Sequence, residues 1–290
     1  MNFDTPMSTW YVLTLAVHPD QAEWIADRIR ERFAIEPVQL ERPGGAQAWV
    51  EIYFEREDEI RPVEEALKKE CPILASAVRT CDSRDWQAFW QLHFKARNVG
   101  KRLRIVPAWE LPEHREPDRR TLRIVPGLSF GTGEHFSTRF CLEMIDRLAP
   151  PGPCRSMWDV GCGSGILGVA GALLDMDSVL GTDNDAVCLT QAAENAALNG
   201  VRRKTTWRQA DITEARDGGE SFDLVCANLF ANLLMETASV LWPATGRYLV
   251  LSGIREFEVD AVAETFIRFG AQEVVRDGDG DWAGLLFARA

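Results

Sequence analysis

The sequence lacks the features of a membrane or secreted protein. No apolar run approaches the roughly 18 to 20 residues that a helix needs to cross a bilayer. Residues 1–6 have neither the basic nor the apolar region of a signal peptide. The seven cysteines are scattered and include no Cys-x-x-Cys pair, so neither a disulfide framework nor a zinc site is indicated. We therefore expect a cytoplasmic protein with no metal site and no membrane partner.

Positive charge is also scarce, because 32 lysine and arginine residues are outnumbered by 44 aspartate and glutamate residues. The net charge of −12 argues against non-specific binding to a nucleic-acid backbone, which needs Lys and Arg to displace counterions. It is compatible with a basic protein partner, although acidity also keeps proteins soluble. With 290 residues, 46% of them hydrophobic, the chain is long enough for two domains and a large core.

The N-terminal part of the chain predicts a small α+β domain. Its periodicity and turn residues indicate strands and helices in the order β-α-β-β-α-β: Trp10–Val17, Gln21–Phe33, Glu36–Leu40, Trp49–Phe54, Glu57–Lys69 and Ile73–Thr80. This is the order of a ferredoxin-like domain. Open sheets of this kind are common binding platforms, so the order alone names no function.

A connecting region follows this domain. Asp85–Phe94 is aromatic-rich and predicts a helix whose aromatic stripe is used for packing. The same five residues then occur at Leu103–Pro107 and at Leu122–Pro126, which predicts two strands joined by an exposed polar loop. We expect an N-terminal domain at 1–82, a linker helix and strand at 83–120, and a large domain at 121–290.

The stretch Met157–Gly168 predicts a buried strand, a glycine-rich turn and the start of a helix. Asp159 lies near the end of the strand, and Gly161, Gly163 and Gly165 let the backbone pass close to a ligand. A second carboxylate closes the next apolar run, about 20 residues further on, where nucleotide-binding α/β sheets bind ribose hydroxyls. This residue is Asp183.

The spacing of the glycines indicates which nucleotide is bound. A dinucleotide fingerprint has a glycine at its sixth position, where this chain has Ile166. A pyrophosphate also needs a helix N-terminus unopposed by a carboxylate. Asp159 beside the turn better suits the cationic methionine end of S-adenosylmethionine. The motif resembles the first motif of class I S-adenosylmethionine-dependent methyltransferases; an ordinary strand-to-helix turn is the alternative.

The large domain predicts an α/β doubly wound sheet. Its seven expected strands are Ser156–Val160, Ser178–Thr182, Thr205–Gln209, Phe222–Ala227, Tyr248–Ile254, Gln272–Val275 and Trp282–Ala288. Helices are expected in the first five intervals between them, and a tight turn joins the last two strands. Seven strands ending in a hairpin match the class I methyltransferase fold, and not the six parallel strands of a dehydrogenase domain.

Three further residues are candidates for the site. His135, in the glycine-rich loop Gly127–Thr138, either deprotonates an acceptor or holds the loop in place. Asp211 either accepts a hydrogen bond from an adenine amino group or caps a helix. Asn228 ends the fourth strand and either faces the reacting groups or caps the next helix. The prolines of the Asn-Pro-Pro-Tyr motif are absent after Asn228, which argues against an exocyclic base amine as the acceptor.

Together these residues resemble the PrmA family, the methyltransferases of protein eleven of the large ribosomal subunit. The resemblance covers five segments: Trp90–Glu110, Pro126–His135, Asp159–Leu167, Gly181–Asp185 and Ala227–Leu229. Its specific part is the Phe-Gly-Thr-Gly-x-His loop, residues 130–135. The chain departs from the family at Val125 and Phe136, where the family usually has Asp and Pro.

The resemblance implies an enzyme that uses S-adenosylmethionine. Family contacts carry over to Thr138, Gly161, Asp183 and Asn228, and we add two residues from the analysis above. The expected cofactor-binding residues are Thr138, Gly161, Gly163, Asp183, Asp211 and Asn228, and no catalytic residue is assigned. The family further implies an N-terminal domain that grips the substrate protein.

The expected reaction is methyl transfer to amino groups of a basic ribosomal protein of the large subunit. Lysine side chains are the expected acceptors, with an N-terminal α-amine as a further one. Three alternatives stay open: a methyltransferase for a different protein lysine, an NAD-dependent oxidoreductase, and a non-catalytic module that binds adenosine compounds.

Overall fold

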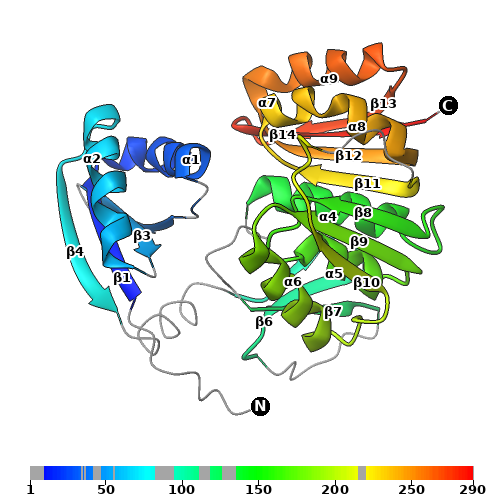
Figure 1. Cartoon of the computed structure of the whole chain (residues 1–290), viewed down its shortest axis with the longest axis horizontal. Helices are drawn as coiled ribbons and strands as arrows, with labels where there is room; N and C mark the ends of the chain where they lie inside the picture. The colour runs from blue at the N-terminus through cyan, green and yellow to red at the C-terminus, as the bar shows by residue number, and fades with distance from the viewer. Residues whose placement is uncertain are drawn as a thin grey trace. The chain divides into compact units, whose positions relative to one another are not determined.

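The computed structural model describes residues 10–33, 35, 37–41, 47–54, 56–81, 95–110, 118–125, 135–214 and 220–289. The chain forms two compact units: the described residues up to Cys81 make the first, and those from Lys95 onward make the second (Figure 1). The helix expected at Asp85–Phe94 lies outside the described residues. Domain boundaries at 82 and 120 therefore stay predictions, although residues 95–110, which we assigned to a linker, lie in the second unit.

The first unit is a four-stranded antiparallel sheet with two α-helices. Its elements are β1 (Trp10–Val17), η1 (Pro19–Gln21), α1 (Ala22–Phe33), β2 (Val38–Glu41), β3 (Ala48–Phe54), η2 (Glu57–Glu59), α2 (Ile60–Glu70) and β4 (Ala75–Cys81). The strand order is β2-β3-β1-β4. Leu13, Leu15 and Ile52 of the sheet pack with Ile25 of α1 and Leu67 of α2 in one apolar core. The predicted β-α-β-β-α-β order is confirmed.

The second unit begins with a three-stranded sheet. It contains β5 (Arg97–Val99), β6 (Leu103–Pro107) and β7 (Arg120–Ile124), in that spatial order. β5 and β6 are antiparallel, whereas β6 and β7 are parallel. The strand predicted at Leu103–Pro107 is present, and the one predicted at Leu122–Pro126 begins and ends two residues earlier, as β7. None of the described strands pairs with the outer edge of β7.

A seven-stranded sheet dominates the second unit. Its strands are β8 (Ser156–Val160), β9 (Ser178–Asp183), β10 (Thr205–Gln209), β11 (Phe222–Asn228), β12 (Thr245–Arg255), β13 (Gln272–Gly278) and β14 (Trp282–Ala288). The spatial order is β10-β9-β8-β11-β12-β14-β13, and β14 is antiparallel to both its neighbours. This confirms the predicted seven strands and their closing hairpin.

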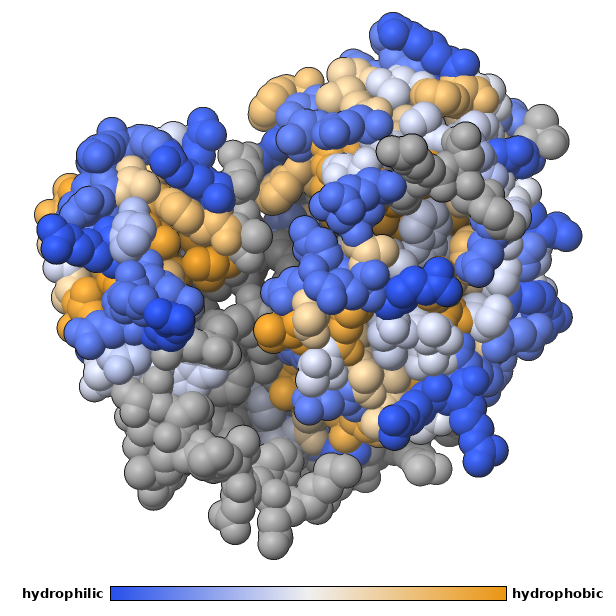
Figure 2. Space-filling model, in the orientation of Figure 1, coloured by the Kyte–Doolittle hydropathy of each residue, from blue (hydrophilic) through white to orange (hydrophobic). Residues whose placement is uncertain are grey.

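Helices cover both faces of this sheet. They are α4 (Phe136–Leu148), α5 (Ile166–Leu173), α6 (Ala186–Leu198), α7 (Ala231–Glu236), α8 (Ala238–Ala244), η3 (Glu256–Glu258) and α9 (Val259–Arg268). Leu234, Leu241 and Phe266 of α7, α8 and α9 share an apolar core with one face. Phe140 of α4 packs so closely over Gly284 of β14 that a Cβ there would lie 2.3 Å from its ring. Figure 2 shows hydrophilic side chains interspersed with smaller apolar patches on the visible outer surface of this unit.

The prediction of a helix between β10 and β11 is wrong for the residues that the structure describes there. Between β10 and β11, residues 212–214 form a turn, and no described residue of this interval is helical. The Oδ1 atom of Asp211 accepts hydrogen bonds from the backbone N–H and the hydroxyl of Thr213, which closes this turn. The two glycines at 218–219 also make this interval a poor helix former.

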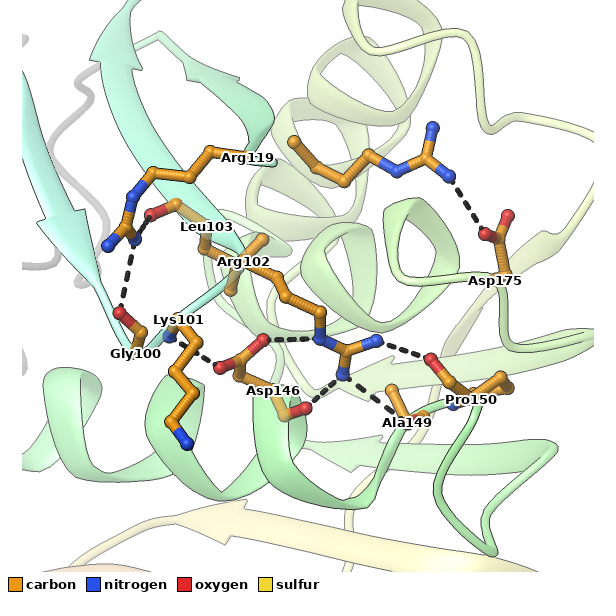
Figure 3. Close-up of polar contacts among 10 residues, drawn as sticks. Gly100, Lys101, Arg102, Leu103, Arg119, Asp146, Ala149, Pro150 and Asp175 are labelled. Carbon is orange, nitrogen blue, oxygen red and sulfur yellow. Dashed lines mark hydrogen bonds and ion pairs between the residues drawn. The ribbon is translucent and has the colours of Figure 1, made fainter. Parts of the chain in front are cut away.

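A buried ion pair ties the small sheet of the second unit to α4. Arg102 Nε donates to Asp146 Oδ1 at 2.8 Å, and the backbone N–H of Lys101 donates to Asp146 Oδ2 at 2.7 Å (Figure 3). Arg102 also donates to the carbonyl oxygens of Asp146, Ala149 and Pro150, at the C-terminal end of α4. A guanidinium is favourable there because it satisfies carbonyls that the helix leaves unpaired and complements the helix dipole.

We expect Asp146→Asn to lower the free energy of unfolding by about 2–3 kcal/mol, because it leaves Arg102 without its charge partner in a largely buried place. The matched control is Asp175→Asn, because Asp175 makes exposed ion pairs with Arg120 at 3.0 Å and with Lys204 at 3.3 Å. An exposed pair contributes only about 0–1 kcal/mol. Urea unfolding of both variants measures the difference. Equal losses of unfolding free energy in the two variants would contradict the conclusion that the Arg102–Asp146 pair connects the small sheet to α4.

Candidate functional site

The residues expected to form the site lie at one edge of the seven-stranded sheet. β8, β9, β10 and β11 are parallel, and their carboxyl ends are Val160, Asp183, Gln209 and Asn228. The first strand of this sheet in sequence, β8, lies in its interior, between β9 and β11. The chain therefore adds β9 and β10 on one side of β8 and the remaining strands on the other side. Ligands of open α/β sheets bind at the carboxyl edge beside such a switch point.

The glycine-rich turn after β8 has a backbone conformation that residues other than glycine rarely adopt. Gly161, Gly163 and Gly165 have φ angles of 66°, 50° and 75°. A Cβ on Gly161 would lie 2.5 Å from Leu229 Cδ2, and one on Gly165 would lie 2.7 Å from the Cβ of Ala192. Both the left-handed conformation and the close packing therefore require glycine here. The contact with Leu229 also brings the end of β11 next to this turn.

The carboxylate of Asp183 is held by two backbone amides. Its Oδ2 accepts from Gly163 N at 2.9 Å, and its Oδ1 accepts from Asp185 N at 3.0 Å. An ionised carboxylate has about four acceptor positions, so each oxygen can still accept a hydroxyl. Asp183 thus joins the end of β9 to the glycine turn and presents a fixed pair of acceptors beside it.

The side chain of Asp159 does not lie where the sequence suggested. We expected it beside the cationic end of a ligand, but its side chain is completely buried. Its Oδ2 accepts from Gly168 N at 2.8 Å in the first turn of α5, and its Oδ1 has no partner among the described residues. The reason is geometric, because the unpaired amides of a helix N-terminus attract a carboxylate. A carboxyl group there occupies the position that a pyrophosphate would need.

We expect Asp159→Asn to change the pH dependence of stability. Burial raises the pKa of Asp159 to about 8 in the folded chain, against roughly 3.9 when unfolded. Between these values the folded state binds more protons, so this group lowers the free energy of unfolding as the pH rises through that range. The asparagine variant should therefore gain stability relative to the wild type by about 1–3 kcal/mol between about pH 5 and pH 8. Urea unfolding of the variant and the wild type at both pH values measures this gain. A difference in unfolding free energy between the two proteins that is the same at both pH values would contradict the prediction.

Asp211 and Asn228 lie after β10 and at the end of β11. Asp211 is exposed, and the two hydrogen bonds from Thr213 lower the pKa of its carboxyl. Its observed contacts are those of a turn cap, and a bond to adenine would use its remaining acceptor positions. Asn228 is half-buried. A Cβ on Gly253 of β12, whose φ is 79°, would lie 3.0 Å from Asn228 Oδ1, so this glycine leaves room for the amide.

The start of α4 contains the two remaining candidates. His135 caps the helix: its Nδ1 accepts from Ser137 N at 3.2 Å and lies 2.8 Å from the Ser137 hydroxyl. The ring also meets Trp282 edge-on at 4.7 Å. This geometry supports a role in holding the segment, because Nδ1 is occupied. Thr138 is buried, and its hydroxyl has no partner among the described residues.

S-adenosylmethionine fits this arrangement. The glycine turn leaves space for close approach of a ligand, and Asp183 offers oriented acceptors for two ribose hydroxyls. The Thr138 hydroxyl has no partner in the described part of the chain and is available to a ligand. The side chain of Asp159 accepts from Gly168 N in the first turn of α5, so this amide is not free to bind the pyrophosphate of a dinucleotide. The described residues contain no cluster of three or more His, Cys, Asp or Glu side chains suited to a metal ion. None of the helices that the structure describes is long and apolar enough to cross a membrane.

Two structural features of the site were not predicted from the sequence. Trp207 of β10 packs against Gly181 of β9, where a Cβ would lie 2.2 Å from two ring atoms. Asn195 of α6 is completely buried and donates to the carbonyl oxygen of Ser164 in the glycine turn, at 2.8 Å. The four-residue spacing of Gln191, Asn195 and Asn199 on α6 is the signal that could have revealed the second feature.

Comparison with known proteins supports the same conclusion. A family model described as Ribosomal protein L11 methyltransferase (PrmA) matches residues 14–290. A ribosomal protein L11 methyltransferase of Geobacter sulfurreducens is 37% identical over 218 residues, covering 74% of this chain and 70% of the relative. Another from Idiomarina loihiensis is 31% identical over 302 residues, covering 97% and 99%.

A solved structure agrees with the fold. The ribosomal protein L11 methylase of Lactobacillus delbrueckii subsp. bulgaricus has a TM-score of 0.60 and 31% identity, covering 68% of this chain and 99% of its own. The predicted fold class, the predicted class of enzyme and S-adenosylmethionine as its cofactor are thereby confirmed. The chain belongs to the ribosomal protein L11 methyltransferase family.

Proposed function

We propose that this protein transfers methyl groups from S-adenosylmethionine to amino groups of ribosomal protein L11, on lysine side chains and on the N-terminal α-amine. The observation that supports this most is the carboxylate of Asp183, fixed by Gly163 N and Asp185 N beside a left-handed glycine turn. The relatives named above supply the substrate.

The six predicted residues would hold the cofactor from different sides. Gly161 and Gly163 let the backbone approach it, Asp183 accepts from the ribose hydroxyls, and Asp211 accepts from the adenine amino group. Thr138 offers its buried hydroxyl, and Asn228 lies at the edge where the acceptor enters. These roles are consistent with the positions of the residues at the carboxyl edge of the sheet.

The bound cofactor supplies a methyl group already activated on a sulfonium. The protein therefore has to align the acceptor amine with that group and exclude water. A lysine must first lose a proton, since its unperturbed pKa is roughly 10.4, and desolvation in the site lowers that value. The Asn228 amide oxygen can accept a hydrogen bond from the amine and orient it. With His135 Nδ1 engaged by Ser137, deprotonation into solvent is the simplest route.

The substrate is expected to be a basic protein, which suits a chain of net charge −12. The same charge disfavours a direct contact with nucleic acid. The N-terminal unit is proposed to grip the substrate. The reaction is expected in the cytoplasm, where ribosomal proteins are made, without a membrane partner.

The test combines binding with transfer. Calorimetric titration with S-adenosylmethionine, S-adenosylhomocysteine and NADH is followed by radiolabelled methyl transfer to ribosomal proteins of a cell extract. The proposal predicts binding of the first two ligands and one labelled small basic protein. Binding with no label would indicate a non-catalytic module, and a label on another protein would change the substrate. Binding of NADH alone would indicate an oxidoreductase.

A further inference from the structure

Helix α6 carries a row of side-chain amides on one face. Gln191, Asn195 and Asn199 are four residues apart, so they lie one turn above another along the helix. Gln191 and Asn195 lie within α6, and Asn199 follows it as the C-cap residue. Asn195 is completely buried, which is costly for an amide unless its donors and acceptor are used.

This row of amides pairs with the outer edge of β7. Asn199 Oδ1 accepts from Arg123 N at 2.8 Å, and Asn199 Nδ2 donates to Arg123 O at 2.6 Å. One step further, Asn195 Oδ1 accepts from Val125 N at 3.0 Å, and Gln191 Nε2 donates to Val125 O at 3.1 Å. Arg123 and Val125 are two residues apart, so their backbone groups point to the same side. The three amides thus pair with this edge of β7 as the backbone of a neighbouring strand would.

Asn195 makes one contact that the other two amides do not. Its Nδ2 donates to the carbonyl oxygen of Ser164 at 2.8 Å. Ser164 is nearly fully buried and lies between Gly163 and Gly165, and the amide of the preceding residue, Gly163 N, donates to Asp183. A single buried side chain therefore connects the edge of β7 to the turn of the cofactor site.

We propose that Asn195 is a positioning residue for S-adenosylmethionine, which fixes the glycine turn relative to β7 through its bonds to Ser164 O and Val125 N. The inference rests on the proposed function of that turn. Backbone bonds hold both ends of the turn, from Cys162 N to Thr182 O at 2.9 Å and from Gly165 N to Cys162 O at 2.8 Å. Asn195 adds a bond to Ser164 O, the carbonyl next to Gly163, whose amide donates to Asp183. Asn199 anchors β7 equally well but has no bond to the turn, so it contributes to stability only.

The test compares Asn195→Ala and Asn195→Asp with the matched control Asn199→Ala. The aspartate variant has the same shape and keeps the acceptor for Val125 N. Its carboxyl can donate to Ser164 O only when it is protonated, so binding that weakens as the pH rises decides the question if the alanine variant does not fold. The dissociation constant of S-adenosylhomocysteine is measured by calorimetry, and the midpoint of thermal unfolding is measured for each variant. We expect roughly ten- to a hundredfold weaker binding in the Asn195 variants.

The control should show a lowered unfolding midpoint and a dissociation constant within about twofold of the wild type, because losing Asn199 affects only β7 and the helix end. Wild-type affinity in a folded Asn195 variant would overturn the inference, and so would equal weakening in both positions. If the wild type itself binds neither S-adenosylmethionine nor S-adenosylhomocysteine, the proposed function fails and this inference fails with it.

Discussion

Asp183→Ala is expected to weaken the binding of S-adenosylhomocysteine by roughly a hundredfold or more. The change removes both acceptors for the ribose hydroxyls. It also releases Gly163 N and Asp185 N, which the carboxylate now holds at 2.9 and 3.0 Å. The glycine turn then loses the bond that sets its distance from β9. Calorimetric titration of the purified variant measures the effect, and methyl transfer should fall with it.

The control for this change is two residues away. Asp185 caps α6 by accepting from Val187 N at 2.8 Å, and Asp185→Ala leaves its own backbone bond to Asp183 in place. Loss of a cap costs about 1 kcal/mol of stability. The Asp185 variant should therefore be slightly less stable and bind normally. If the Asp183 variant binds as the wild type does, the location of the cofactor site is wrong.

Gly181→Ala is expected to lower the free energy of unfolding by about 3 kcal/mol, since a Cβ there would lie 2.2 Å from Cε3 and Cζ3 of Trp207. The indole has little room to move away, because it also packs closely on Gly165 and Gly168. A Cβ built on Gly165 would lie 3.0 Å from its Cη2 atom, and one built on Gly168 would lie 3.1 Å from the same atom. The methyl group must therefore displace the ring or separate β9 from β10. Urea unfolding of the variant measures the loss.

A double-mutant cycle identifies the cause of that loss. Trp207→Leu alone should destabilise by leaving a cavity, but in its presence the glycine change should cost much less. The coupling between the two positions is expected to be at least about 1 kcal/mol. Additive losses would mean that the requirement for glycine at 181 has a different origin.

The fold could be predicted from the sequence because its signals are local. Two predicted stretches of strand length, the largely apolar Ser156–Val160 and the more polar Thr205–Gln209 with its β-branched and aromatic residues, match β8 and β10 residue for residue. The interval after β10 was the exception. A helix was expected there by analogy with its neighbours, whereas Asp211 and Thr213 close a turn.

The site was predictable only in part. The glycine turn and Asp183 could be identified from the sequence, because a left-handed turn and a carboxylate at the end of the next strand follow one another in a fixed order along the chain. The direction of the Asp159 side chain, which is buried against Gly168 N, depends on how the first turn of α5 packs on β8, and the sequence does not show this. The contacts of Trp207 with Gly181 and of Asn195 with Ser164 join elements far apart in sequence. The sequence carries no signal for the first contact, and for the second it carries only the four-residue spacing of the amides on α6, which does not identify Ser164 as the partner.

The most direct test of the proposed function is the mass of purified ribosomal protein L11 after incubation with this enzyme and S-adenosylmethionine, with Asp183→Ala as the negative control. The proposal predicts that the mass of L11 rises in whole methyl increments, on lysine side chains or the N-terminal amine, and only with the wild-type enzyme. An unchanged mass under conditions where the enzyme binds S-adenosylmethionine would contradict it.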